Sequence, residues 1–188
     1  YEEAGSGTPI LFVHEFAGDY RNWEPQMRYF SRRHRCIAYS ARGYKPSDVP
    51  NDVSAYTYKH WISDAIAVLD HLKIDKAHFV GLSMGGYTVV LIGTHQPGRA
   101  LSLTAAGAGS GSERTQTEEF RKNALATADL FEKSGSAEVV RTYGLSAPRI
   151  PSRPPKPNLS DPENDPGIDD ERLFGPSGDD QRIEVDFL

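Results

Sequence analysis

The sequence lacks most of the residues that support disulfide, metal or membrane chemistry. Its 188 residues include a single cysteine, Cys36, which has no partner for a disulfide within the chain and lies in an apolar run typical of a protein core. The six histidines are scattered, and their spacing matches no metal-ligand pattern. No apolar run reaches the roughly 18 residues that a membrane-spanning helix requires. We therefore expect a protein without a disulfide, a bound metal or a membrane segment.

Basic residues are fewer than acidic ones. The chain has 21 lysines and arginines against 26 aspartates and glutamates, so its formal net charge is −5. This balance does not favour nucleic acid or an anionic membrane surface as a partner. No basic segment followed by an apolar one opens the chain, which predicts a cytoplasmic location. The chain begins at Tyr1 rather than at a methionine, so we also expect its natural start to be missing.

A dinucleotide-binding signature is absent as well. The glycine-rich segment from Gly107 to Ser112 comes close to the pattern G-x-G-x-x-G, but Ser112 occupies the position of the third glycine. We interpret this segment as a loop at the exit of a strand. The sequence therefore implies no cofactor.

What the sequence does contain is a serine between glycines, Ser83, in the segment Gly81–Gly86 (G-L-S-M-G-G). The apolar run before it, Ala77–Val80, is typical of a buried strand, and the run after it, Tyr87–Ile92, predicts a buried helix. A strand, a turn with glycines on both sides of one serine, and then a helix form the context of a nucleophile elbow. Ser83 is therefore a candidate nucleophile. The structural alternative is a glycine-rich turn with an ordinary surface serine.

Steric and electrostatic arguments explain the residue types of this segment. An elbow holds the serine backbone in a strained conformation, so that its hydroxyl projects from the turn. Side chains in place of Gly81 and Gly85 would collide with the neighbouring strand and helix, so glycine fits at both positions. The start of the helix leaves the backbone N–H of Met84 without a partner and places a positive dipole end near a developing oxyanion.

The order of the predicted elements indicates an α/β fold. A helix capped by Asp19 follows the first predicted strand, and a helix from Tyr58 to Leu72 precedes the strand that leads to Ser83. This alternation predicts a three-layer, doubly wound and mostly parallel sheet with helices on both faces. The expected central strands are Ile10–Val13, which is a continuous apolar run, Cys36–Tyr39, Ala77–Gly81 and Leu101–Ala106.

The composition changes after Tyr143. Eight of the 13 prolines lie between Gly144 and Leu188, together with many aspartates and few clustered apolar residues. Proline disfavours helix and central strand, and such a segment buries too little apolar area to offset the entropy of ordering it. We therefore divide the chain into a domain over residues 1–143 and a Pro/Asp-rich tail over residues 144–188 that is irregular or disordered. Before the tail we expect a polar helix over Glu118–Lys133 and a short one over Ala137–Tyr143.

Four segments, in this order, resemble the α/β-hydrolase superfamily, specifically its single-domain esterase, lipase and haloperoxidase-like members. The segment His14–Phe16 is similar to the H-G-x segment of the family, and Ala41–Ser47 is similar to its D-x-R-G-x-G-x-S loop. Trp61–Leu72 looks like the helix before the elbow, and Gly81–Gly86 like the elbow itself. The resemblance covers residues 1 to about 143 and implies an α/β-hydrolase domain that is truncated at both ends. It implies Ser83 as nucleophile, with the backbone N–H groups of Phe16 and Met84 as oxyanion-hole donors.

The chain also departs from the family pattern. Glu15 replaces the glycine of the oxyanion loop, Ser40 stands where an aspartate is usual, and Lys45 replaces a glycine. In the family, the catalytic acid and then the histidine follow the serine. In this chain no histidine follows His95, and the exit of the last predicted strand, Gly107 to Ser112, has no carboxylate, so no base and no acid are found. His14, whose loop borders the elbow, is the nearest candidate base, although its position is structural in the resembling family. We interpret His78 as a core histidine.

Two hypotheses follow from these residues. In the first, the chain is a truncated serine hydrolase of small ester-like substrates, inactive by itself because the acid and base are missing. In the second, it is a non-catalytic α/β-hydrolase-like protein or a frame-altered product with an unrelated tail. A downstream coding sequence with a strand followed by aspartate, and then a strand followed by Gly-His, would favour the first.

The resemblance leaves ester, lactone, amide and perhydrolysis chemistry open and implies no oligomeric state. Ser83 in place of an aspartate argues against epoxide and haloalkane chemistry, for which the resembling enzymes use an aspartate nucleophile.

Overall fold

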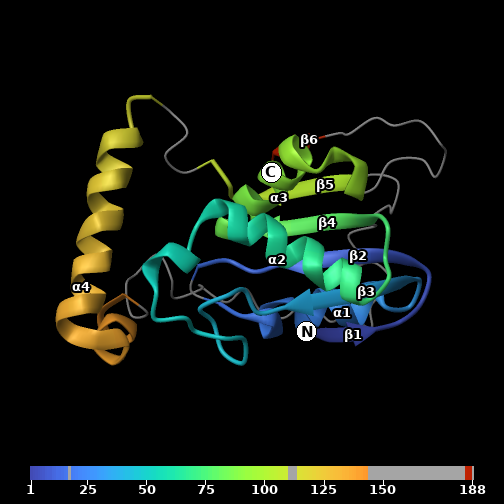
Figure 1. Cartoon of the computed structure of the whole chain (residues 1–188), viewed down its shortest axis with the longest axis horizontal. Coiled ribbons are helices and arrows are strands. Elements are labelled where there is room, and N and C mark those ends of the chain that lie inside the picture. The colour runs from blue at the N-terminus through green and yellow to red at the C-terminus, as the bar shows by residue number, and fades with distance from the viewer. Residues whose placement is uncertain (17, 110–113, 144–184, 188) are drawn as a thin grey trace, which may run out of the picture. The chain divides into compact units, whose positions relative to one another are not determined.

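The computed structural model describes residues 1–16, 18–109, 114–143 and 185–187 (Figure 1). Its helices are α1 (Glu24–Phe30), α2 (Tyr58–His71), α3 (Met84–His95) and α4 (Thr117–Tyr143), with 3-10 turns η1 (Tyr20–Trp23), η2 (Val53–Ala55) and η3 (Pro97–Arg99). Its strands are β1 (Glu2–Ala4), β2 (Thr8–Val13), β3 (His34–Tyr39), β4 (Ala77–Leu82), β5 (Ala100–Ala106) and β6 (Val185–Phe187). The four predicted central strands are confirmed as β2 to β5.

The described strands form one sheet in the order β1-β3-β2-β4-β5-β6. β1 is antiparallel to β3, whereas the other neighbouring pairs are parallel. β4 is a central strand, because Gly81 pairs with Val13 of β2 on one side and with Ala105 of β5 on the other. The chain passes from β2 to β3 in one direction and then crosses back to β4. Open α/β sheets bind ligands at such a reversal, outside the carboxyl ends of the strands.

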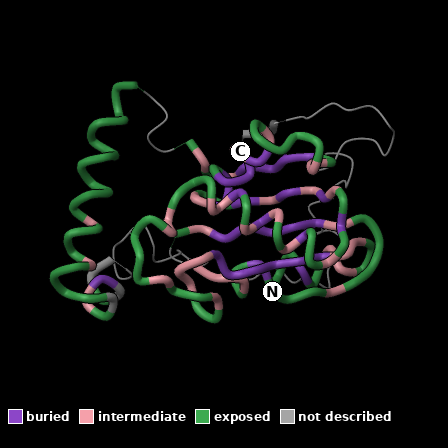
Figure 2. Tube along the Cα trace, in the orientation of Figure 1, coloured by how far each residue is buried: buried purple, intermediate pink, exposed green. Residues whose placement is uncertain are grey.

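Helices cover both faces of this sheet, as predicted, and the side chains of β2 show why. Successive residues of a strand point to opposite faces. Leu11 and Val13 belong to a core to which α2 and α3 contribute. Ile10 and Phe12 belong to a second core with η1 and α1, where the ring centroids of Phe12 and Trp23 are 5.0 Å apart. Buried residues are concentrated in the strands between these two layers of helices (Figure 2).

The described residues divide into two compact units. Residues 1–109 together with β6 belong to the first unit, and α4 belongs to the second. α4 is interrupted at Gly135, whose φ of 73° and ψ of 169° are not helical. The two helices predicted over 118–133 and 137–143 therefore correspond to the two parts of α4 on either side of this glycine.

The predicted tail lies almost entirely outside the described residues. Residues 144–184 and 188 are not described, so an irregular tail and a domain boundary at residue 143 stay predictions. The exception is β6, in which Val185 pairs with Leu103 of β5. The sequence did not predict this strand, because three residues are too few to show a strand periodicity. No helix in the described part of the chain combines the length and the apolarity that crossing a bilayer demands.

Candidate active site

Ser83 lies between the end of β4 and the start of α3, where the motif predicts an elbow. Its φ of 53° and ψ of −113° lie outside the usual conformations of L residues, a strain often found at functional sites. The backbone is fixed at both ends. The Ser83 N–H donates to the Ala106 carbonyl at 2.8 Å, and the Ser83 carbonyl accepts from the Tyr87 N–H at 2.9 Å. The residue is exposed and its side chain makes no capping hydrogen bond, so the hydroxyl is presented at the carboxyl end of β4.

The glycines around Ser83 leave no room for side chains. A Cβ at Gly81 would overlap the first turn of α3 and lie 2.6 Å from the Gly86 nitrogen. A Cβ at Gly85 would overlap the carbonyl oxygen of Val13 and lie 2.7 Å from that of His14. Distances this short are not tolerated between non-bonded atoms without a backbone shift. The tight turn thus depends on glycine at both flanking positions, as the steric argument for the motif requires.

The contact between Gly85 and the end of β2 places the start of α3 against the loop that carries Phe16. Phe16 follows closely after His14 in this loop, and its side chain is exposed. Met84 is the first residue of α3, so its N–H has no acceptor within the helix. The two N–H groups predicted to bind an oxyanion therefore come from a loop and a helix start that touch each other. Their role as oxyanion donors stays a prediction.

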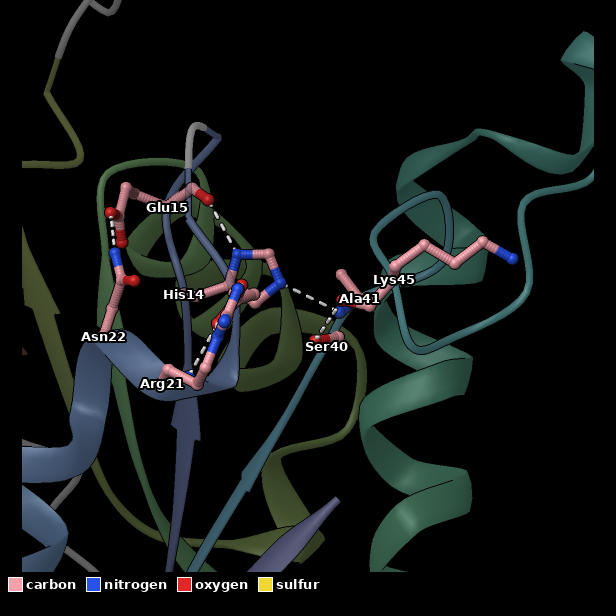
Figure 3. A network of polar contacts seen from close by, with 8 residues as sticks. His14, Glu15, Arg21, Asn22, Ser40, Ala41 and Lys45 are labelled. Atoms are coloured by element: carbon pink, nitrogen blue, oxygen red, sulfur yellow. Dashed lines mark hydrogen bonds and ion pairs between the residues drawn. The ribbon is translucent and has the colours of Figure 1, made fainter. Parts of the chain in front are cut away.

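His14 is fully buried, and both of its ring nitrogens are engaged (Figure 3). Nε2 accepts a hydrogen bond from the Ala41 N–H at 2.9 Å, so Nδ1 carries the proton and donates it to the Glu15 carbonyl at 2.7 Å. Burial lowers the pKa of the ring, which keeps it neutral. The His14 side chain thus links the loops after β2 and β3 and has no lone pair left to take a proton from Ser83.

The remaining histidines are also engaged away from Ser83. His78, interpreted from the sequence as a core residue, is only partly buried: its Nδ1 lies 2.7 Å from the Ser102 Oγ, and burial, with a smaller effect of His34, lowers its pKa to about 4. The others contact groups of their own surroundings, namely His34 with Thr8, His60 with Thr57, His71 with Tyr1 and His95 with Leu91. Within the described residues, none of the histidines is hydrogen-bonded to Ser83, so the site shows no general base.

The loop after β3 is closed by its own hydrogen bonds and tied to α2. The Ser40 Oγ donates to the Lys45 carbonyl at 3.2 Å, and the Ser47 Oγ donates to the Ser40 carbonyl at 2.7 Å. Arg42 donates two hydrogen bonds to the Asp64 carboxylate, at 2.7 and 2.9 Å. The departure from the family at Ser40 is therefore compatible with a closed loop. Sequence reasoning missed Asp64, because nothing in the local pattern indicates a partner 22 residues away.

Comparison with known proteins places these features in a family. A family model described as "alpha/beta hydrolase fold" matches residues 8–136. The chain is 33% identical over 131 residues to 3-oxoadipate enol-lactonase 1 of Acinetobacter baylyi, a match that covers 70% of this chain and 46% of that protein. It is 38% identical over 79 residues to epoxide hydrolase 1 of Siraitia grosvenorii, covering 42% of this chain and 25% of that protein. The chain thus spans less than half the length of these curated relatives.

Solved structures agree on the fold. The enol-lactonase from Burkholderia xenovorans LB400 matches with a TM-score of 0.64 at 22% identity, over 76% of this chain and 53% of that one, which is a likeness of fold. Epoxide hydrolase VrEH1 from Vigna radiata matches with a TM-score of 0.54 at 27% identity, over 55% of this chain and 33% of that one. The sheet order, the turn at Ser83 and the family model all lead to one conclusion: this chain belongs to the α/β-hydrolase superfamily.

Proposed function

We propose that this chain supplies the nucleophile and the oxyanion-binding part of a serine hydrolase that acts on small ester-like substrates, lactones among them. The observation that carries the proposal is the backbone of Ser83, held at a φ of 53° at the end of β4. Strained conformations persist only where the surroundings enforce them. Here the close contacts of Gly81 and Gly85 and two backbone hydrogen bonds enforce one that exposes a hydroxyl.

The proposed reaction is acyl transfer. The Ser83 Oγ attacks the carbonyl carbon of the ester, the new C–O bond forms, and the proton of the hydroxyl passes to a base. The negative charge that develops on the carbonyl oxygen is stabilised by the N–H groups of Phe16 and Met84 and by the positive end of the α3 dipole. Collapse of the tetrahedral intermediate breaks the bond to the leaving alcohol or enol, and water then releases the acid from the serine.

The names of the relatives point to two substrate classes, and Ser83 favours one of them. A lactone is a cyclic ester, so attack on its carbonyl creates the oxyanion that a pair of N–H donors fits. An epoxide has no carbonyl, so the same donors have no acyl oxyanion to stabilise. Large apolar side chains, those of Leu82 and Tyr87, are exposed close to Ser83 in the chain, which favours a substrate with an apolar body.

This chain contributes no base in the proposal. Without one, Ser83 stays protonated and is a weak nucleophile. Binding and oxyanion stabilisation alone retain about 10³–10⁴-fold over water in enzymes that have lost their triad. We therefore assign the acid and histidine of a complete enzyme to a part of the fold that this chain does not cover. The alternative is a non-catalytic α/β-hydrolase-like protein, in which Ser83 has no special reactivity under any condition.

A base added in solution tests the proposal on this chain directly. The protein is treated with p-nitrophenyl acetate at increasing imidazole concentrations, and acetylation of Ser83 is measured by peptide mass spectrometry. We expect negligible acetylation without imidazole, acetylation in proportion to its concentration, and none at position 83 in Ser83→Ala. Ser63→Ala, an exposed position on α2, serves as the matched control and should leave acetylation of Ser83 unchanged. Acetylation of Ser83 no faster than that of Ser63 would support the non-catalytic alternative.

A further inference from the structure

We propose that Glu15 is a positioning residue that holds the oxyanion loop in place through Asn22. The inference rests on the proposed function, because the loop carries the Phe16 N–H that is assigned to the oxyanion. The position is of interest because the resembling family has glycine there, and this chain has a carboxylate instead.

The backbone of Glu15 closes the turn that contains Phe16. The Glu15 carbonyl accepts one hydrogen bond from the Nδ1–H of His14 at 2.7 Å and a second from the Gly18 N–H at 3.2 Å. The first bond fixes the turn to a fully buried ring, and the second joins its two ends. The orientation of the Phe16 peptide group therefore depends on how Glu15 is held.

The side chain of Glu15 adds a hydrogen bond to a separate element, η1. Its Oε1 accepts a hydrogen bond from the Asn22 side-chain amide of η1 (Figure 3). The carboxylate also lies against the turn itself, since a Cβ at Gly18 would be 2.6 Å from the Glu15 Oε1. Glu15 thus connects the turn around Phe16 to η1 with its side chain, while its backbone closes that turn.

Asn22 is a fixed point because η1 is itself well anchored. Asp19 caps η1 by accepting from the Arg21 N–H at 2.9 Å, and the Asn22 N–H donates to the Asp19 carbonyl at 3.1 Å. The next residue, Trp23, is buried against Phe12 of β2. The hydrogen bond from Asn22 therefore restrains Glu15 relative to the sheet, and with it the turn that presents the Phe16 N–H.

The remaining carboxylate oxygen shows which variant should preserve this arrangement. The Glu15 Oε2 is buried and has no hydrogen-bond partner among the described residues. Glu15→Gln keeps the acceptor for Asn22, and the amide nitrogen that replaces Oε2 breaks no bond. Glu15→Ala and Asn22→Ala each remove the tie, so the conservative variant separates positioning from a general effect of substitution.

Amide hydrogen exchange followed by NMR tests the inference without relying on activity. We expect the Gly18 amide to exchange about tenfold faster in Glu15→Ala and in Asn22→Ala, with the amides of β2 unchanged. Glu15→Gln should exchange as the wild type does. Arg28→Ala is the matched control, because Arg28 pairs with Glu24 on the exposed side of α1. Unchanged exchange of Gly18 in both alanine variants, or equal acceleration throughout β2, would overturn the proposal.

The imidazole-dependent acetylation of Ser83 then connects the loop to the chemistry. Asn22→Ala should be acetylated about tenfold more slowly than the wild type, and Glu15→Gln at the wild-type rate. If Ser83 of the wild type is acetylated and Asn22→Ala keeps the same rate, the positioning role is wrong although the proposed function stands. If the wild type itself is not acetylated, the proposed function fails, and the exchange measurement alone decides whether Glu15 orders the loop.

Discussion

Gly85 occupies a position in which even a methyl group does not fit. The effect of this restriction on the free energy of unfolding can be measured. An alanine there gains helix propensity of about 1 kcal/mol, but its Cβ overlaps the Val13 carbonyl, and relieving that overlap costs about 1–3 kcal/mol or more. We expect Gly85→Ala to lower the free energy of unfolding, measured by urea denaturation. Gly98→Ala is the control, because a Cβ there has no atom within 4 Å, and it should change the free energy by less than about 0.5 kcal/mol. Equal midpoints for the two variants would show that the turn is looser than described.

The lowered pKa of His78 predicts how the stability of the fold depends on pH. Burial is the main cause that lowers its pKa from 6.5 to about 4, so between these values the unfolded chain binds a proton that the folded chain does not. The contribution of His78 to the free energy of unfolding is therefore fully present above pH 6.5. It is lost as the pH falls from 6.5 toward 4, and the free energy changes little through this residue below pH 4. Urea denaturation of His78→Gln should show a weaker loss of stability across this window than the wild type does. A loss of stability as steep in His78→Gln as in the wild type would contradict this prediction.

Single residues also show what a sequence can and cannot predict about a site. The position of Ser83 follows from six consecutive residues, because the elbow is a local structure with local steric rules. The partners of Glu15 and Arg42 do not follow in this way. Asn22 and Asp64 lie seven and 22 residues from them, and only the folded arrangement brings each pair together.

Strands and helices were predicted correctly where burial leaves a clear apolar pattern in the sequence. Ile10 to Val13 of β2 are apolar on both faces, because helices cover both sides of the sheet, and such a strand appears as a continuous apolar run. β6 has three residues and gives no pattern. The break in α4 follows from Gly135, whose positive φ is open to glycine at little cost and interrupts helical geometry.

The ion pair between Arg42 and Asp64 can be used to test how the loop after β3 is held against α2. It joins the loop after β3 to α2 by two hydrogen bonds, and each side chain is only about a quarter exposed. A double-mutant cycle with Arg42→Ala and Asp64→Ala should give a coupling free energy of about 0.5–1 kcal/mol, because bidentate pairs with reduced exposure exceed ordinary surface pairs. The same cycle on Arg28 and Glu24, which are mostly exposed, should give less. Equal couplings would mean that the loop after β3 does not depend on α2.

For the molecule as a whole, the fold and the candidate nucleophile agree, while none of the histidines in the described part of the chain is hydrogen-bonded to Ser83. Every histidine of the sequence lies between His14 and His95, and in the described residues each is engaged by other groups. The sequence could predict this absence, because it contains no histidine after the strand that follows the elbow. The substrate could not be predicted in the same way. Two hollows of the described surface, one against β1 and α1 and one at the end of β3, do not include Ser83 among their lining residues.

Labelling of this chain with a fluorophosphonate probe, without any added base, tests most directly the claim that it holds a nucleophile but no base. The probe reacts with serines that a neighbouring base activates. We predict slow and substoichiometric labelling of Ser83, close to that of the exposed Ser63 in the same sample. Rapid, stoichiometric labelling that disappears in Ser83→Ala would contradict the account, since it would mean that a histidine assigned here to the structure serves as the base.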